Sequence, residues 1–184
     1  AGATGGELDK MKRQAIELGA KTAFSAKEAA QGMENLASAG FQVNEIMDAM
    51  PGVLDLAAVS GGDVAASSEA MASSLRAFGL EAGQAGHVAD VFARAAADTN
   101  AETVDMAEAM KYVAPVAHSM GLSLEETAAS IGIMADAGIK GSQAGTTLRG
   151  ALSRIAKPTK AMVKSMDQLG VSFYDANGKM IPLR

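Results

Sequence analysis

The stretch Ser123-Leu-Glu-Glu-Thr-Ala-Ala-Ser-Ile-Gly-Ile-Met-Ala-Asp-Ala-Gly138-Ile139 contains the start, the body and the end of one helix. Ser123, followed three residues later by Glu126, reads as a capping box, in which each side chain accepts a hydrogen bond from the other residue's backbone N–H. Gly138 followed by an apolar residue predicts the helix end, because glycine enters the left-handed conformation without steric cost. The stretch therefore predicts a short helix closed by a tight turn.

The same ending recurs along the whole chain, at Gly40-Phe41, Gly79-Leu80, Gly121-Leu122 and Gly170-Val171. Further helix starts are predicted at Ser25 with Glu28, at Asp63, and at Thr99 with Glu102. Together with the apolar periodicity, these signals predict helices over 7–21, 26–39, 43–59, 63–78, 82–97, 101–119, 124–137, 142–156 and 159–169. Pro51 and Pro115 fall inside two of them and should kink or break each one. We predict an all-α fold, an array of short antiparallel helix hairpins with glycine-terminated helices.

An internal repeat is indicated by placing residues 25–58 over residues 123–156 without a gap. Nine of the 34 aligned positions are identical, including the Gly40/Gly138 helix ending. A looser copy centres on Gly79. Alanine-rich helices also produce chance matches, so two interpretations stay open here. A true repeat predicts a stack of helix pairs, each of which buries a face against its neighbours.

The spacing of apolar residues is no longer helical near the C-terminal end of the sequence. Apolar and aromatic residues flank Asp175-Ala-Asn-Gly178, and Asn-Gly is a strong turn signal between two short strands. We therefore expect a small β-hairpin, which must dock on other residues because two strands alone are marginally stable in water. The expected organisation is an N-terminal lead-in helix over 1–22, a helical repeat core over 23–169 and the hairpin over 170–184.

Composition limits the chemistry. The chain has 184 residues with 39 Ala, 20 Gly, 12 Met and no Trp or Cys, so small residues and methionine must fill the core. The lack of cysteine excludes disulfides and cysteine-based metal sites or nucleophiles. No apolar run is long enough to span a membrane, and no signal peptide is recognisable. The absence of an initial Met leads us to expect an excised fragment of a longer chain.

The net charge of −5 is unevenly distributed. Residues 1–139 hold 8 Lys+Arg and 19 Asp+Glu, a net charge of −11, whereas residues 140–184 hold 8 and 2, a net charge of +6. An uneven solvated surface is the simplest interpretation. A basic end that meets an acidic partner, such as the acidic end of a neighbouring copy, is the sharper one. Contact with DNA is weakly indicated, since no aromatic residues are interleaved with the basic ones.

No constellation predicts catalysis or cofactor or metal binding. Neither His87 nor His118 has a second ligand at helical spacing, and we expect both to be structural. The run 138–147 departs from a phosphate-binding loop because Lys140 precedes the second glycine; it predicts a turn and then a helix packed closely through Gly145 and Gly150. Residues 175–178 lack the later ligands of a calcium loop. A cationic stripe is conceivable along Arg149, Arg154, Lys157, Lys160 and Lys164, with a solvated face as the default. We predict no catalytic, cofactor-binding or metal residues, and no enzyme.

An ordered set of segments carries a family resemblance. It comprises Thr22-Ala-Phe-Ser-Ala-Lys-Glu-Ala-Ala30, Leu36-Ala-Ser-Ala-Gly40, Met50-Pro-Gly-Val-Leu-Asp-Leu-Ala57, Val113-Ala-Pro-Val-Ala117, Ala135 through Arg149, and Leu169 through Lys179. In this order the segments resemble the conserved core block of tail tape measure proteins of long-tailed bacteriophages and prophages, of the lactococcal-phage type. The resemblance covers the chain from about residue 14 to the end.

The resemblance implies a structural role in the virion. Such proteins are mostly helical, occupy the tail tube or tail tip, set tail length, and can assist genome passage at infection. The implied partners are copies of the chain itself, tail tube and tail-tip or baseplate proteins, and tail assembly chaperones in the host cytoplasm. The host membrane and DNA are further implied contacts, and no cofactor is implied. The alternative function is a membrane-inserting or channel-forming segment released at infection; a lytic enzyme is disfavoured, because no paired acid and base are found.

Overall fold

The computed structural model describes residues 4–178 and 180–181. Over these residues it contains nine α-helices and one short 3₁₀ helix. They are α1 (Gly5–Lys21), α2 (Ala26–Ser38), α3 (Val43–Val59), α4 (Val64–Phe78), η1 (Ala82–Gln84), α5 (Ala85–Asp98), α6 (Thr103–Ser119), α7 (Leu124–Asp136), α8 (Gly141–Ala156) and α9 (Lys160–Leu169). The prediction of an all-α array is confirmed, and the predicted boundaries agree to within a few residues.

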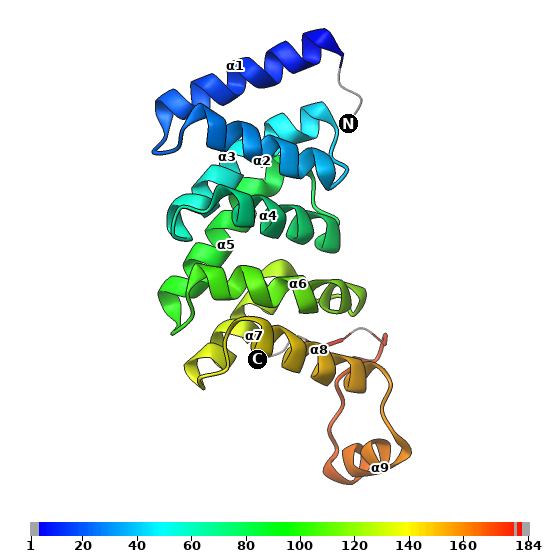
Figure 1. Ribbon diagram of the computed structural model, residues 1–184. Coiled ribbons are helices and arrows are strands. Elements are labelled where there is room, and N and C mark those ends of the chain that lie inside the picture. The colour runs from blue at the N-terminus through cyan, green and yellow to red at the C-terminus, as the bar shows by residue number, and fades with distance from the viewer. Residues whose placement is uncertain (1–3, 179, 182–184) are drawn as a thin grey trace.

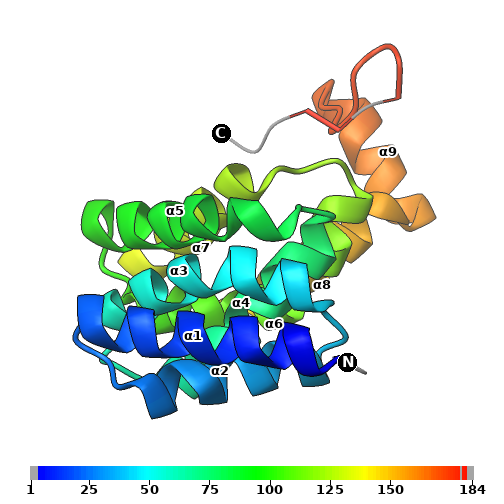
Figure 2. The same ribbon diagram turned by 90° about the horizontal axis from the view of Figure 1, so that it is seen from above.

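The helices stack in two columns (Figure 1). One column holds α2, α4, α6 and α8, and the other holds α3, α5 and α7, with α1 closing the first end against α2. The most extensive contacts join α6 to α8 and α3 to α5, so packing runs along each column as well as across it. Seen along the stack, the helices of each column overlie one another (Figure 2), while α9 projects away from the stack.

The five predicted glycine endings are all present. Gly40, Gly79, Gly121, Gly138 and Gly170 have φ angles between 64° and 87°. In each case the N–H of the next residue donates to a carbonyl five residues earlier, as from Phe41 to Leu36 at 3.1 Å and from Ile139 to Met134 at 2.9 Å. Phe41 and Leu122 are fully buried, so the turn also delivers an apolar side chain to the core. Val171 is the exception, with 47% of its surface exposed.

The helix starts follow the predicted capping with one error. Ser25 and Ser123 form capping boxes with Glu28 and Glu126. The predicted cap at Thr99 is wrong, because the Thr99 hydroxyl donates to the Ala95 carbonyl at the end of α5. Instead Glu102 is the N-cap residue of α6, and its backbone N–H donates to Asp105.

The prolines do not interrupt their helices. Pro51 lies inside α3 and Pro115 inside α6, and each helix continues to both sides of the ring. Both prolines are exposed, so each ring lies on the solvent side of its helix. The predicted local break is therefore absent, because tertiary packing of the buried face holds the helix together where the local backbone hydrogen bond is missing.

The predicted C-terminal β-hairpin is wrong for the described residues. The Asp175–Gly178 turn forms, with the Gly178 N–H donating to the Asp175 carbonyl at 3.0 Å. Only one antiparallel bridge follows from it, between Tyr174 and Met180, and no strand is assigned. The Ser172 hydroxyl bonds the Tyr174 carbonyl locally and thus competes with a ladder. Lys179 and residues 182–184 of the predicted hairpin lie outside the described residues, as do residues 1–3 of the predicted lead-in.

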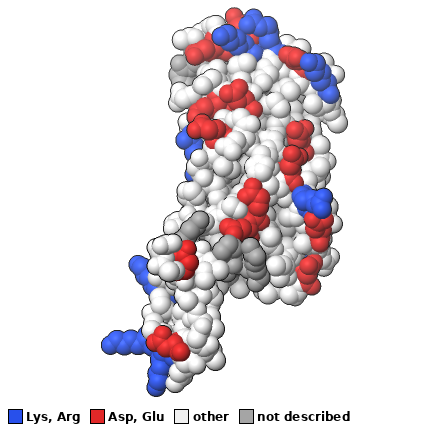
Figure 3. Space-filling model, turned by 180° about the vertical axis from the view of Figure 1, so that it is seen from behind, with Lys and Arg blue, Asp and Glu red and all other residues white. Residues whose placement is uncertain are grey.

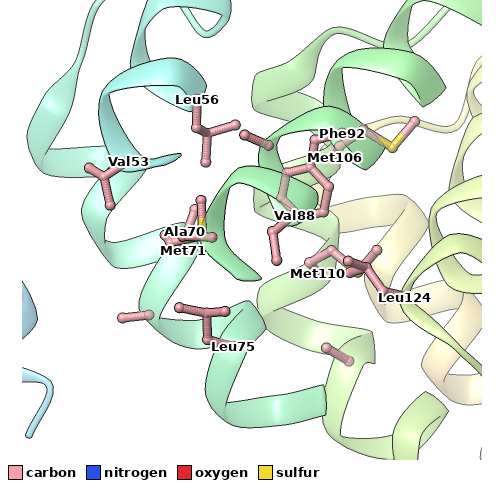
Figure 4. Packing of buried hydrophobic residues seen from close by; sticks show 14 of the residues in the cluster. Val53, Leu56, Ala70, Met71, Leu75, Val88, Phe92, Met106, Met110 and Leu124 are labelled. Atoms are coloured by element: carbon pink, nitrogen blue, oxygen red, sulfur yellow. The ribbon is translucent and has the colours of Figure 1, made fainter. Parts of the chain in front are cut away.

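The core is filled by methionine, leucine and alanine around Phe92 (Figure 4). Met71, Met106 and Met110 are at most 1% exposed and lie between the columns. Flexible methionine side chains fill irregular gaps that a core with few aromatic residues would otherwise leave. The core therefore runs continuously along the stack instead of dividing into separate centres.

Close helix contacts occur at particular glycines. A Cβ atom on Gly145 of α8 would lie 2.3 Å from the carbonyl oxygen of Ala109 on α6, and one on Gly52 of α3 would lie 2.4 Å from the backbone of Ala85. The predicted close packing through Gly145 is present. The prediction for Gly150 is wrong, because a Cβ atom there would meet nothing within 4 Å.

These two glycines of α8 provide a matched stability test. We expect Gly145→Ala to lower the free energy of unfolding by about 1–3 kcal/mol, because α6 and α8 must separate to admit the methyl group. Gly150→Ala should instead raise it by up to about 1 kcal/mol, since alanine favours the helix and the site is open. Urea unfolding followed by circular dichroism measures both. Equal effects of the two substitutions would contradict the close α6–α8 contact.

Candidate functional site

No catalytic, cofactor or metal residues are predicted from the sequence, and the surfaces that could bind a partner are therefore the candidate sites. In the described part of the chain, no group of three His, Asp or Glu side chains is placed to hold a metal ion. None of the helices there combines the length and the apolar character that a bilayer crossing requires. The surface features that remain are grooves between neighbouring helices and an uneven charge distribution.

One apolar surface is a groove between α5 and α7, which we call the α5–α7 groove. It encloses about 460 Å³ and is lined by His87, Asp90, Val91, Arg94, Ala95, Asp98, Thr99, Glu125, Ala128, Ala129 and Ile133. Alanines line its floor, and such small side chains leave the two helices with a hollow between them. Ile133 on its edge is 64% exposed. The groove thus offers apolar surface with acidic side chains on its walls.

One side-chain hydrogen bond crosses this groove. His87 Nε2 of α5 lies 2.7 Å from Glu125 Oε1 of α7, and both side chains are about half exposed. His87 is predicted from the sequence to be structural, and Glu125 is its partner in the structure. That partner was missed because it lies 38 residues away and no local pattern links the two.

The pKa of the Glu125 carboxyl lies below its ordinary value. The main cause is a hydrogen bond from its own backbone N–H, which is free at the first turn of α7. Partial burial opposes the shift, and the Ser123 hydroxyl and His87 add to it. A carboxyl with a lowered folded-state pKa stabilises the fold above its unfolded pKa, and this contribution is lost as pH falls through the folded-state value.

The pKa of Glu125 can be tested by substituting its neighbour. We expect the Glu125 carboxyl to titrate below 4.5 in the wild-type chain and to shift upward in His87→Ala while staying below 4.5. The reason is that the larger backbone hydrogen bond survives the substitution. Carboxyl carbon NMR across pH 2 to 7 measures both midpoints. A wild-type midpoint at or above 4.5 would contradict the α7 N-terminal geometry.

A second groove lies at the first end of the stack, between α1 and α2; we call it the α1–α2 groove. It is lined by Leu8, Met11, Lys12, Ala15, Ile16, Ala26, Lys27, Ala30, Met33, Glu34 and Ala37. Leu8 and Ile16 are 61% and 55% exposed. Its lining charges are two lysines and one glutamate, so it is the more basic of the two grooves.

The other residues considered in the sequence analysis have structural positions. His118 lies in the last turn of α6 and packs edge-on against Phe78 of α4, with ring centroids 6.0 Å apart. The glycine-rich run 138–147 forms the α7–α8 turn and the first part of α8. Arg149 and Arg154 lie on α8, whereas Lys160 and Lys164 lie on the projecting α9, so the predicted stripe is divided between two helices.

The charge distribution is visible on the surface. In Figure 3, Asp and Glu side chains are spread over the body of the stack, and Lys and Arg side chains gather at its first end and on the projecting arm. The basic arm and the acidic body correspond to the charge asymmetry between residues 140–184 and residues 1–139. A basic arm attached to an acidic body is the clearest electrostatic feature of the molecule.

Taken together, the described residues define a helical packing module, a two-column stack of short helices with apolar grooves, an acidic body and a basic projecting arm. The sequence profile of one protein family, described as phage-related minor tail protein, matches residues 12–184. The chain therefore belongs to that family.

Two curated relatives are named as tape measure proteins. The chain is 94% identical over 184 residues to the tape measure protein of Pneumococcus phage Dp-1, covering all of this chain and 16% of that protein. It is 36% identical over 177 residues to the probable tape measure protein of Escherichia phage P2, covering 96% of this chain and 22% of that protein. No solved structure matches the chain. The resemblance to phage tail tape measure proteins is confirmed, and the chain spans about a fifth or less of these relatives.

Proposed function

We propose that this segment is a compact anchoring or initiation module of a phage tape measure protein, acting in tail assembly through helix–helix contacts inside the tail tube or at the tail tip. It contributes to tail-length determination by fixing one end of the measuring chain, and it leaves the tail with that chain during genome delivery. Its proposed partners are copies of itself, tail tube and tail-tip or baseplate proteins, and tail assembly chaperones in the host cytoplasm. The division into 1–22, 23–169 and 170–184 stays a prediction.

The observation that carries this proposal is the shortness of the helices. A ruler made of one continuous helix would extend about 1.5 Å per residue, or roughly 280 Å for this chain. The longest described helices have 17 residues, about 26 Å each, and successive helices fold back on one another. A chain that reverses direction at every turn makes a poor measuring rod and a suitable fixed body.

The relatives support a modular interpretation. The chain matches 16% of one tape measure protein and 22% of another, so most of each relative lies outside the match. A long measuring segment and a compact anchoring segment can therefore occupy different parts of one such protein. Disturbing the fold at constant length should affect tail assembly if the segment is an anchor, and should not if the segment is part of the ruler.

The proposal predicts that fold matters more than length in this segment. In the phage or prophage that encodes the chain, Gly52→Leu combined with Gly145→Leu keeps the residue count but forces side chains into the backbones of α5 and α6. We expect the yield of infectious particles to fall about tenfold or more, with tailless heads in electron micrographs, because the stack loses several kcal/mol of stability. Gly150→Leu is the control and should leave assembly intact, since the site is open.

A deletion tests the same proposal from the other side. Removing residues 23–169 should prevent tails from assembling. If the segment were part of the ruler, the deletion would give complete tails shortened by about 220 Å, at 1.5 Å per residue. Shortened but complete tails, together with normal assembly of the double glycine variant, would contradict an anchoring role.

A further inference from the structure

Helix α9 is the one described α-helix without a packing partner. It has no buried residue, and it makes no extensive contact with any other helix. Figures 1 and 2 show it projecting from the end of α8. We call residues 157–171, which include α9, the arm.

The arm is strongly amphipathic. Met162, Met166 and Leu169 follow the i, i+4, i+7 spacing of one helix face, and Val163 lies beside them. Leu169 is 76% exposed and Val163 42% exposed. Met162 and Met166 are partly buried. Val163, Leu169 and the following Val171 lie in solvent, whereas the apolar faces of the other helices are largely buried in the stack.

The arm is held away from its own stack at both ends. Residues 157–159 connect α9 to α8, and the chain returns to α8 after Gly170. There the Tyr174 hydroxyl donates to the Ile155 carbonyl at 3.4 Å, and Met180 is buried. Both ends of the arm are therefore fixed at the C-terminal end of α8, and α9 projects from the stack between them (Figures 1 and 2).

The α5–α7 groove fits the arm in length and in chemistry. Its lining residues on α5 run from His87 to Asp98, about 18 Å of helix, and the ten residues of α9 span about 15 Å, so α9 can lie along the groove. Its floor is lined by alanine and valine, which can receive methionine and leucine side chains. Small residues on a groove floor allow a helix to approach closely.

Charge selects this groove over the α1–α2 groove. The arm carries Lys157, Lys160 and Lys164 against Asp167, a net charge of +2. The α5–α7 groove is lined by three acidic residues and Arg94, a net charge of −2 with His87 neutral. The α1–α2 groove is lined by two lysines and one glutamate, a net charge of +1. The acidic body, with −11 over residues 1–139, also attracts the arm at longer range.

We propose that the arm of one copy of this chain docks in the α5–α7 groove of a second copy, with Met162, Met166 and Leu169 facing the alanine-lined floor. Exchange of arms between two copies gives a closed dimer in which the same two surfaces are used twice. This inference rests on the proposed function, which includes contacts between copies, and it names the surfaces that make them.

Sedimentation velocity on the 184-residue chain tests the dimer. Because only a ten-residue helix would be buried in each groove, we expect a dissociation constant of about micromolar order. The protein concentrations should therefore extend to about 300 µM. We expect a species of twice 18.6 kDa to grow with concentration. A single 18.6 kDa species at every concentration would overturn the proposal. This holds whether the arm then packs in the groove of its own chain or binds a membrane of anionic phospholipid.

Variants of residues on the two proposed surfaces then locate the interface. Ile133→Asp in the α5–α7 groove should weaken dimerisation about tenfold or more, and the matched Ile16→Asp in the α1–α2 groove should leave it unchanged. On the arm, Met166→Asp should weaken it about tenfold or more, and Met166→Lys clearly less, because the receiving groove is acidic. Neither arm variant disturbs a buried residue, so folding is preserved.

The outcomes separate the competing surfaces. The choice of groove would be overturned if Ile16→Asp weakened dimerisation and Ile133→Asp did not. It would also be overturned if Met166→Lys weakened dimerisation more than Met166→Asp. A dimer insensitive to both Ile133→Asp and Met166→Asp would overturn the proposal altogether. A monomeric chain whose glycine variants still abolish tail assembly would contradict this inference alone and would leave the anchoring function standing.

Discussion

The backbone hydrogen bond across a left-handed glycine is the interaction on which the rest of this fold depends. It joins the N–H of the residue after the glycine to the carbonyl five residues earlier, as between Leu122 and Ala117 at 3.0 Å. This bond satisfies a carbonyl that the helix end would leave free, and it stops the helix there. It also turns the next apolar side chain, such as Phe41 or Leu122, into the core. Repeated along the chain, it converts one sequence into a series of short helices that must pack on one another.

Packing in this fold relies on small residues. Where Gly52 meets Ala85 and Gly145 meets Ala109, the backbones of neighbouring helices are in direct contact. Such contacts bring the helices of one column close together, and methionine fills the irregular space between columns. The same use of alanine has a second consequence on the surface, because helices with small facing residues leave grooves between them. The stability of the stack and its capacity to receive a partner helix thus arise from one compositional feature.

Local signals made most of the fold predictable. The glycine endings and the serine capping boxes are each encoded within about six residues, so the sequence was sufficient to predict them. Thr99 was assigned wrongly because its hydroxyl has a competing acceptor, the Ala95 carbonyl, that a start signal does not reveal. The β-hairpin prediction was wrong because the Asn-Gly signal specifies only the turn. Whether strands then pair also depends on competing hydrogen bonds, such as the one from the Ser172 hydroxyl to the Tyr174 carbonyl.

The candidate surfaces were less predictable. The His87–Glu125 pair and the α5–α7 groove join residues 38 apart in the chain, and only the packing of two helices brings them together. The exposure of α9 was also hidden, because its apolar spacing is the same as that of helices that are buried. The charge asymmetry was visible in the sequence, but the separation of a basic arm from an acidic body requires the fold.

Small-angle X-ray scattering of the dilute Met166→Asp chain measures whether the glycine-ended helices pack into a compact two-column stack. A packed domain of this length has a radius of gyration of about 16 Å, and a moderately elongated stack about 20 Å. We expect a radius of gyration between these two values. A radius above about 40 Å, as for an unfolded chain, or a profile of one continuous rod, would contradict the compact stack.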